Sequence, residues 1–172
     1  MKLIPFVCFL FSCISISESY RYQYYNKTPP NTTETITNIE DKPTASDVPL
    51  DHTKLNSFVN RWLGVPYKYG GRSMNGIDCS AFSQTFYQHF FNIPLKRTAA
   101  EQFKQGVDVS SGDYDYGDLI FFRIEGSDID HVGVYLYRDR FIHASSSQGV
   151  TISSLTEDYY SSRYAGAKRL TD

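Results

Sequence analysis

The sequence of 172 residues lacks the short motifs that mark nucleotide-binding and zinc sites. It contains no Gly-rich phosphate loop, no Cys-x-x-Cys pair and no His-Glu-x-x-His motif, so we expect neither a metal nor a cofactor. The net charge is only −2, which gives no sign of a nucleic-acid-binding surface. With 41% apolar and 21% charged residues, the composition is that of an ordinary globular protein with one domain.

Cysteine is also scarce. The three cysteines are Cys8, Cys13 and Cys79, and the first two lie in an apolar run at the N-terminus. Only Cys79 lies in the region expected to fold, so that region cannot form an internal disulfide. A single thiol of this kind is either buried and inert or reactive.

Residues 1–17 have the pattern of an export signal, because a positive charge is followed by an apolar run too short to span a bilayer. Residues 10–13 read Leu-Phe-Ser-Cys and resemble a bacterial lipobox, although Phe11 is larger than the residue usual there. We therefore expect a lipid on Cys13, which would anchor the exported protein to the outer membrane in the periplasm. Ordinary signal cleavage nearby, with loss of Cys13, is the alternative.

Residues 18–48 are polar and lack sustained periodicity, which predicts a flexible tether. Residues 49–172 form the predicted domain. Apolar spacing and end signals predict a helix from Asp51 to Gly64, a helix from Cys79 to about Phe91 capped by Asp78, and a short helix over 98–105. Strands are expected at 119–122, 132–137, 141–144, 150–152 and 164–170, with a helical turn within 155–161. Helices followed by strands indicate an α+β fold.

The expected position of Cys79 at a helix start favours reactivity. Free backbone N–H groups and the positive end of the helix dipole favour a thiolate, which is the nucleophilic form. The same N–H groups could bind an oxyanion during attack on a carbonyl. The alternative is a small buried apolar residue, which is common for cysteine.

A cysteine nucleophile needs a base, and the chain has four histidines. His52 precedes the first helix, and His89 lies roughly 15 Å along the second helix from Cys79. His131 and His143 lie on neighbouring strands and could meet in one cleft. A two-residue turn between these strands would put them on opposite faces, so a longer loop or a bulge is needed.

Five ordered motifs resemble those of the NlpC/P60 family of cell-wall cysteine peptidases. They are Gly64–Gly71 (GVPYKYGG), Gly76–Ser80 (GIDCS), Tyr116–Phe122 (YGDLIFF), His131–Tyr135 (HVGVY) and Phe141–Ser145 (FIHAS). The resemblance covers about residues 55–169, and the stretch 143–154 further resembles a murein endopeptidase of this family that is an outer-membrane lipoprotein. One departure is Ala81, where the family often has glycine.

The resemblance implies a papain-like fold in which N-terminal helices pack on an antiparallel β-sheet, with the nucleophile at a helix N-terminus. It also implies a Cys-His-His triad. Cys79 would attack an amide carbonyl, His131 would act as general base and acid, and His143 would orient His131.

Three further residues acquire expected roles from the same resemblance. Tyr67 would help to stabilise the oxyanion, although by itself it would be taken for a loop aromatic packed in the domain. Asp78 and Ser80 flank the nucleophile and are the weaker candidates, for contacts with substrate.

The implied reaction is hydrolysis of peptidoglycan stem peptides by an endopeptidase, at the cross-link between D-Ala and meso-diaminopimelate. Cleavage between D-γ-glutamate and diaminopimelate is the alternative bond, and an amidase or acyltransferase on the same scaffold is an alternative activity. A silent wall-binding module would keep the fold, but the intact Cys79, His131 and His143 argue against it. We expect a monomer whose partner is a peptidoglycan peptide.

Overall fold

The computed structural model describes residues 52–170, without the side chain of His52. The predicted export signal, the tether, the lipidation site at Cys13 and the helix cap at Asp51 lie outside these residues. Within the described part no helix is long and apolar enough to cross a membrane. The helices there are α2 (His52–Trp62), α3 (Cys79–Phe90), α4 (Ala99–Gln102) and α5 (Asp158–Ser161).

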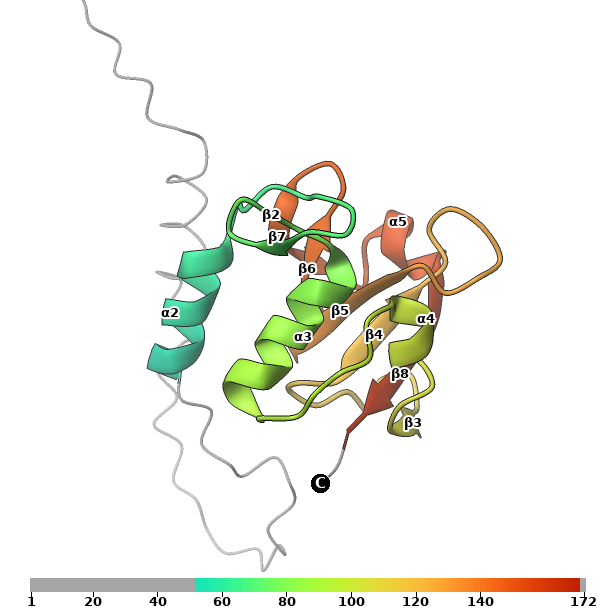
Figure 1. The fold of residues 1–172 in the computed structure, drawn as a ribbon. Coiled ribbons are helices and arrows are strands. Elements are labelled where there is room, and N and C mark those ends of the chain that lie inside the picture. Colours follow the sequence, from blue (N-terminus) through green and yellow to red (C-terminus); the bar gives the residue numbers. More distant parts are fainter. Residues whose placement is uncertain (1–51, 171–172) are drawn as a thin grey trace, which may run out of the picture. The chain divides into compact units, whose positions relative to one another are not determined.

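The strands of this region form a small hairpin and a larger sheet (Figure 1). The hairpin pairs β1 (Arg72–Ser73) with β2 (Gly76–Ile77). The sheet has the order β3-β8-β4-β5-β6-β7, and all neighbouring strands pair antiparallel. Its strands are β3 (Val107–Val109), β4 (Leu119–Phe122), β5 (His131–Tyr137), β6 (Arg140–Ser145), β7 (Gly149–Ser154) and β8 (Tyr164–Arg169).

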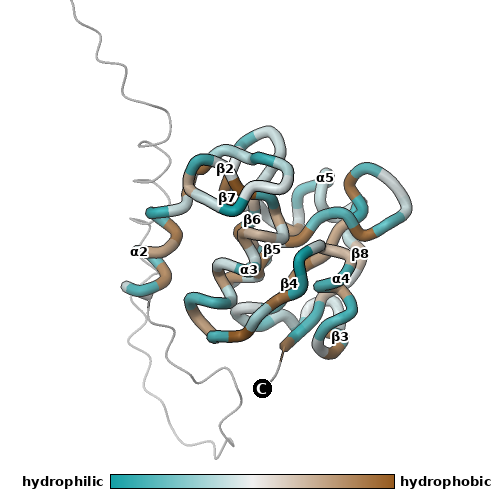
Figure 2. Tube along the Cα trace, viewed as in Figure 1, coloured by the Kyte–Doolittle hydropathy of each residue, from teal (hydrophilic) through white to brown (hydrophobic). Residues whose placement is uncertain are grey.

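Helix α3 packs against the middle of the sheet, where it contacts β5 and β6 (Figure 1). Its side chains Phe82 and Phe86 are fully buried. Helix α2 packs on α3 through Phe58, whose ring centroid lies 6.1 Å from that of Phe82 and 5.4 Å from that of Phe86. Hydrophobic and hydrophilic residues alternate along α2 (Figure 2), as they do in a helix with one buried face.

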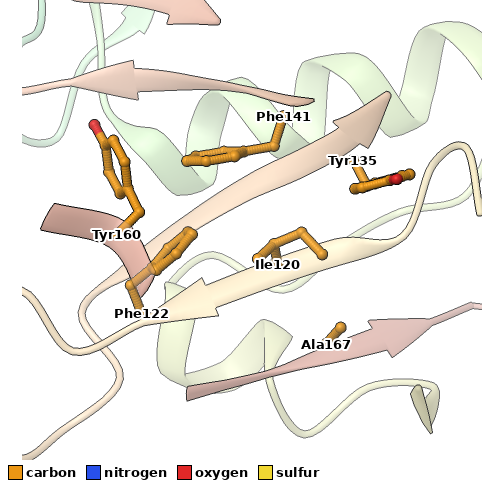
Figure 3. Packing of buried hydrophobic residues seen from close by; sticks show 6 residues of the cluster. All are labelled: Ile120, Phe122, Tyr135, Phe141, Tyr160 and Ala167. Carbon is orange, nitrogen blue, oxygen red and sulfur yellow. The ribbon is translucent and has the colours of Figure 1, made fainter. Parts of the chain in front are cut away.

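Strand β4 is covered on both faces, since Leu119 to Phe122 are all fully buried. The ring of Phe121 lies 5.1 Å from Phe103 at the end of α4, whereas Phe122 lies 5.4 Å from Tyr160 in α5. Successive side chains of a strand face opposite sides, so helical segments cover both faces of β4. Figure 3 shows the cluster on the α5 side, formed by Ile120, Phe122, Tyr135, Phe141, Tyr160 and Ala167.

The α+β architecture predicted from the sequence is confirmed, with differences at the ends of elements. Helix α4 is shorter than the predicted 98–105, because Thr98 caps it in a capping box with Glu101 and the chain leaves the helix after Gln102. Strands β1, β2 and β3 were missed. Their segments are too short or too exposed to show the alternation by which a strand is recognised.

Candidate active site

Cys79 is the first residue of α3, as the sequence predicted. Asp78 precedes it in extended conformation and accepts a hydrogen bond from the Ala81 N–H at 2.8 Å, which caps the helix. The Cys79 side chain is free and 6% exposed. Its Sγ lies 3.8 Å from the carbonyl oxygen of Asp130, the residue that precedes His131. The thiol therefore faces the segment that leads into β5.

The charge state of Cys79 differs from the expectation of a thiolate. Burial raises the pKa of the thiol to about 11, and the nearby Asp78 carboxylate raises it further. The N–H groups of Val132 and Ser80 lower this pKa, but by less than burial raises it. The side chain at rest is therefore a neutral thiol, because loss of solvent outweighs the field of the helix start.

His131 and His143 face each other across the β5–β6 hairpin. His131 Nε2 lies 2.9 Å from His143 Nδ1, and the two ring planes are almost perpendicular. Burial lowers the pKa of His131 to about 4, although the Asp130 carboxylate opposes this shift. Burial, and after it the neighbouring His131, holds the pKa of His143 well below its usual value. Both imidazoles are therefore neutral near pH 7.

A β-bulge brings the two histidines to the same face. The turn between β5 and β6 has only two residues, Arg138 and Asp139, both with positive φ. The pairing shifts between Tyr135 and Tyr137, however, so that Leu136 is an extra residue in β5. This extra residue reverses the alternation of side chains between the turn and His131. Without the bulge at Leu136, His131 and His143 would lie on opposite faces of the sheet.

Behind His143, two hydroxyl groups approach the other ring nitrogen. Ser153 Oγ from β7 lies 3.1 Å from His143 Nε2, and the Tyr160 hydroxyl from α5 lies 3.2 Å from it. His143 itself is 1% exposed. Both ring nitrogens of this buried histidine thus have polar partners. Ser153 and Tyr160 were not predicted from the sequence, because nothing in the local pattern relates them to a histidine on another strand.

Tyr67 lies in the loop before β1 and forms an isolated parallel bridge with Ile77, two residues before Cys79. Lys68 N donates to Ile77 O at 3.2 Å, and Ile77 N donates to Pro66 O at 3.1 Å, so the loop follows the chain that enters α3. Burial, followed by the charges of Cys79 and Asp78, raises the pKa of the Tyr67 phenol to about 12. The phenol is therefore protonated and can act as a hydrogen-bond donor.

Asp78 and Ser80 form a buried polar cluster with Arg97, which the sequence analysis missed. Arg97 donates to Asp78 through both terminal nitrogens and to Ser80 Oγ at 2.9 Å. Asp78 and Ser80 are only 4% and 5% exposed. Their polar atoms are bonded within the protein, so the observed role of Asp78 and Ser80 is to hold the helix start. A contact of either residue with substrate stays a prediction.

The remaining histidines lie outside this arrangement. His89 is exposed on α3 and packs against Phe58 at a centroid distance of 5.0 Å. His52 begins α2, and its side chain is not described. Among residues 52–170 no group of three or more His, Cys, Asp or Glu side chains is arranged to hold a metal ion.

Known proteins share both the sequence and the fold of this region. A model of the NlpC/P60 family matches residues 64–169. A protein of Haemophilus influenzae, "Probable endopeptidase NlpC homolog", is 45% identical over 116 residues, which are 67% of this chain and 61% of that protein. The "Murein DD-endopeptidase MepS/Murein LD-carboxypeptidase" of Escherichia coli (strain K12) is 44% identical over 109 residues, which are 63% of this chain and 57% of that protein.

A crystal structure of an NlpC/P60 family protein from Bacillus cereus superimposes with a TM-score of 0.62 at 33% identity, covering 68% of this chain and 39% of that one. The chain spans 57–61% of the length of the two curated relatives. The family match extends over more than half of the chain and includes Cys79, His131 and His143. The chain therefore belongs to the NlpC/P60 family.

Proposed function

We propose that this protein is a peptidoglycan endopeptidase that cuts stem peptides with Cys79 as nucleophile, His131 as general base and acid, and His143 as the residue that orients His131. The contact of 2.9 Å between His131 Nε2 and His143 Nδ1 carries this proposal. It is supported by Cys79 Sγ, which lies 3.8 Å from the carbonyl oxygen of Asp130, the residue before His131. The contact between the histidines leaves Nδ1 as the nitrogen of His131 that is free to exchange a proton with the thiol.

The reaction would proceed in two steps. Cys79 Sγ attacks the carbonyl carbon of the scissile amide while His131 takes the thiol proton. When the C–N bond breaks, His131 returns this proton to the leaving amine and a thioester remains. Water then attacks the thioester, gives one proton to His131, and releases the carboxylic acid as the proton returns to the thiol.

The pKa shifts favour general base catalysis over a preformed ion pair. With burial raising the pKa of Cys79 to about 11 and lowering that of His131 to about 4, both groups are neutral before attack. Proton transfer therefore accompanies formation of the S–C bond. This pathway requires a neutral His131, which is the form expected at all pH values well above 4.

In this proposal Tyr67 donates to the oxyanion that forms during attack, together with free N–H groups at the start of α3; its protonated phenol supports this role. A Tyr67→Phe variant should lower kcat about 100-fold with little change in KM, because the donor acts only on developing charge. Tyr69→Phe is the matched control, since Tyr69 is in the same loop and 90% exposed. Equal kcat in both variants would contradict this role of Tyr67.

The proposed substrate class comes from relatives that are named for action on murein, among them the Escherichia coli protein described above. We propose the cross-link between D-Ala and meso-diaminopimelate as the bond cut. The purified full chain should release muropeptides from sacculi, and Cys79→Ala should not. Mass spectrometry of the products distinguishes this bond from that between D-γ-glutamate and diaminopimelate. Intact sacculi after treatment with folded, reduced protein would refute the enzymatic proposal and favour a silent wall-binding module.

We further propose that the protein is exported and anchored to the outer membrane through a lipid on Cys13. The lipobox-like residues 10–13 support this proposal. Incorporation of radioactive palmitate in cells should be lost in a Cys13→Ser variant. Incorporation that is unchanged in this variant would refute lipidation at Cys13.

A further inference from the structure

Two hydroxyl groups from separate elements converge on one nitrogen of His143. Ser153 Oγ in β7 and the Tyr160 hydroxyl in α5 lie 3.1 Å and 3.2 Å from His143 Nε2. Ser153 and Tyr160 are 7% and 8% exposed. In a buried site a polar atom without a partner costs free energy, so the arrangement of protons around His143 Nε2 is constrained.

The position of the ring protons follows from what His131 must do. After His131 takes the thiol proton, both of its nitrogens carry a hydrogen. Its Nε2–H must then donate to His143 Nδ1, which has to be a bare nitrogen. The single proton of neutral His143 must therefore be on Nε2, where it needs an acceptor. Ser153 Oγ and the Tyr160 oxygen are the two acceptors placed to receive it.

We propose that Ser153 and Tyr160 are positioning residues that hold His143 in its Nε2–H form, so that His143 can accept a hydrogen bond from protonated His131. The inference rests on the proposed function of His131 as base. It assigns two further residues to the catalytic machinery, each acting through His143 and neither touching the substrate.

The packing of the two residues fits this role. In the β6–β7 ladder Ser153 is paired with Phe141, which puts Ser153 on the same face as His143. The Tyr160 ring lies 5.0 Å from that of Phe141 and 5.4 Å from that of Phe122, so the apolar cluster holds it in place. Figure 3 shows the Tyr160 hydroxyl directed away from Ile120 and Ala167. The two acceptors are held by different elements, so either can remain when the other is removed.

The first test measures the tautomers directly, without any assay of activity. Two-bond ¹H–¹⁵N correlation spectra of the histidine rings in the full chain report which nitrogen carries the proton. In the wild type at neutral pH, His143 should be protonated at Nε2 and bare at Nδ1. In the double variant Ser153→Ala/Tyr160→Phe, the proton should shift toward Nδ1. A bare Nε2 on His143 in the wild type would overturn the proposal.

The second test measures turnover. The double variant should lose about tenfold to 100-fold in kcat with KM unchanged. In this variant the Nε2–H of protonated His131 no longer finds a bare Nδ1 on His143 as its acceptor. Each single variant keeps one acceptor, so the double variant should lose more than the product of the two single losses. The matched control is Ser154→Ala/Tyr159→Phe, which alters the adjacent serine and the adjacent, 49% exposed tyrosine.

Thermal melting of each variant shows whether it is folded. If the double variant does not fold, the wild-type ring spectra decide: a proton on His143 Nε2 supports the proposal, and a proton on Nδ1 overturns it. A folded double variant with kcat within twofold of the control would overturn the proposal. A wild type without activity on sacculi would refute the proposed function, while the ring spectra would still decide the assignment of Ser153 and Tyr160.

Discussion

Arg97 and Asp78 are joined by two parallel hydrogen bonds, from Nη1 to Oδ1 and from Nη2 to Oδ2, next to the residue that starts α3. The same carboxylate accepts from the Gly70 N–H at 3.0 Å and from the Ala81 N–H at 2.8 Å. One side chain thus links Arg97, the glycine-rich loop and the helix that presents Cys79. Burial raises the pKa of Asp78, but the bonds from Arg97, Ala81 and Ser80 outweigh it and leave this pKa below its usual value.

Replacing Arg97 by methionine should therefore destabilise the fold. The variant leaves an almost buried carboxylate without its cation, and we expect the free energy of unfolding at pH 7 to fall by about 2 kcal/mol or more. Urea denaturation measures this change. Arg123→Met, at an exposed arginine, is the matched control. Equal denaturation midpoints for the two variants would show that the ion pair contributes nothing.

The raised pKa of Cys79 predicts slow alkylation at neutral pH. Iodoacetamide reacts with thiolate, so the rate should increase about tenfold per pH unit below the pKa of about 11. Mass spectrometry of the peptide that contains Cys79 follows this rate separately from the other cysteines. Fast alkylation that is independent of pH between 6 and 8 would instead indicate a resting thiolate, stabilised by the helix start or by a charged His131.

The lowered pKa values of His131 and His143 predict that acid destabilises the fold. The unfolded chain takes up protons on both residues near their ordinary pKa of 6.5, whereas the folded protein does so only at lower pH. As pH falls from 6.5 to about 4, the free energy of unfolding should decrease by up to ~1.4 kcal/mol per pH unit for each histidine. Below about pH 4, His131 adds no further loss.

Urea denaturation at several pH values in this interval measures the slope. His143→Asn should reduce it, because one of the two buried groups no longer titrates. His89→Gln alters an exposed histidine and serves as the control. A slope that is the same in the wild type and in His143→Asn would contradict the assignment to His143.

Gly133 in β5 lies two residues after His131 and next to His143 of β6, and it leaves no room for a side chain. A Cβ there would lie 2.5 Å from the Phe141 ring and 3.2 Å from His143 Cβ. Gly133→Ala should therefore cost about 1–3 kcal/mol in stability, displace His143 and lower kcat. Gly126→Ala, with nothing within 4 Å of the added Cβ, should leave both unchanged. An active and stable Gly133→Ala variant would show that His143 tolerates displacement.

Local patterns were sufficient to predict most helices and strands and the position of Cys79. Helix α3 follows from Asp78 as its cap and from phenylalanines at helical spacing, both of which act within one or two turns. Strands β4 to β7 are predicted by short apolar and β-branched runs. These features depend on neighbours in the sequence, so the sequence alone contains the information needed to locate them.

The features that were missed depend on residues far apart in the chain. Arg97 meets Asp78 across 19 positions, and Tyr160 meets His143 across 17. No periodicity connects such pairs, because tertiary packing creates the contact. The prediction that Cys79 is a thiolate at rest was wrong for a related reason. The helix start is a local property, whereas the burial that raises the pKa of the thiol is created by tertiary packing, in which Cys79 Sγ lies 3.8 Å from the Asp130 carbonyl, 51 positions away.

The extra residue Leu136 in β5 also limits how the β5–β6 hairpin can vary in length. Insertion or deletion of a single residue between His131 and His143 turns one of them to the other face of the sheet. A change of two residues restores the original face. Among functional relatives we therefore expect hairpin lengths to differ in even steps, unless a second bulge compensates. The odd or even length of this hairpin is then a simple criterion for distinguishing active members from inactive ones.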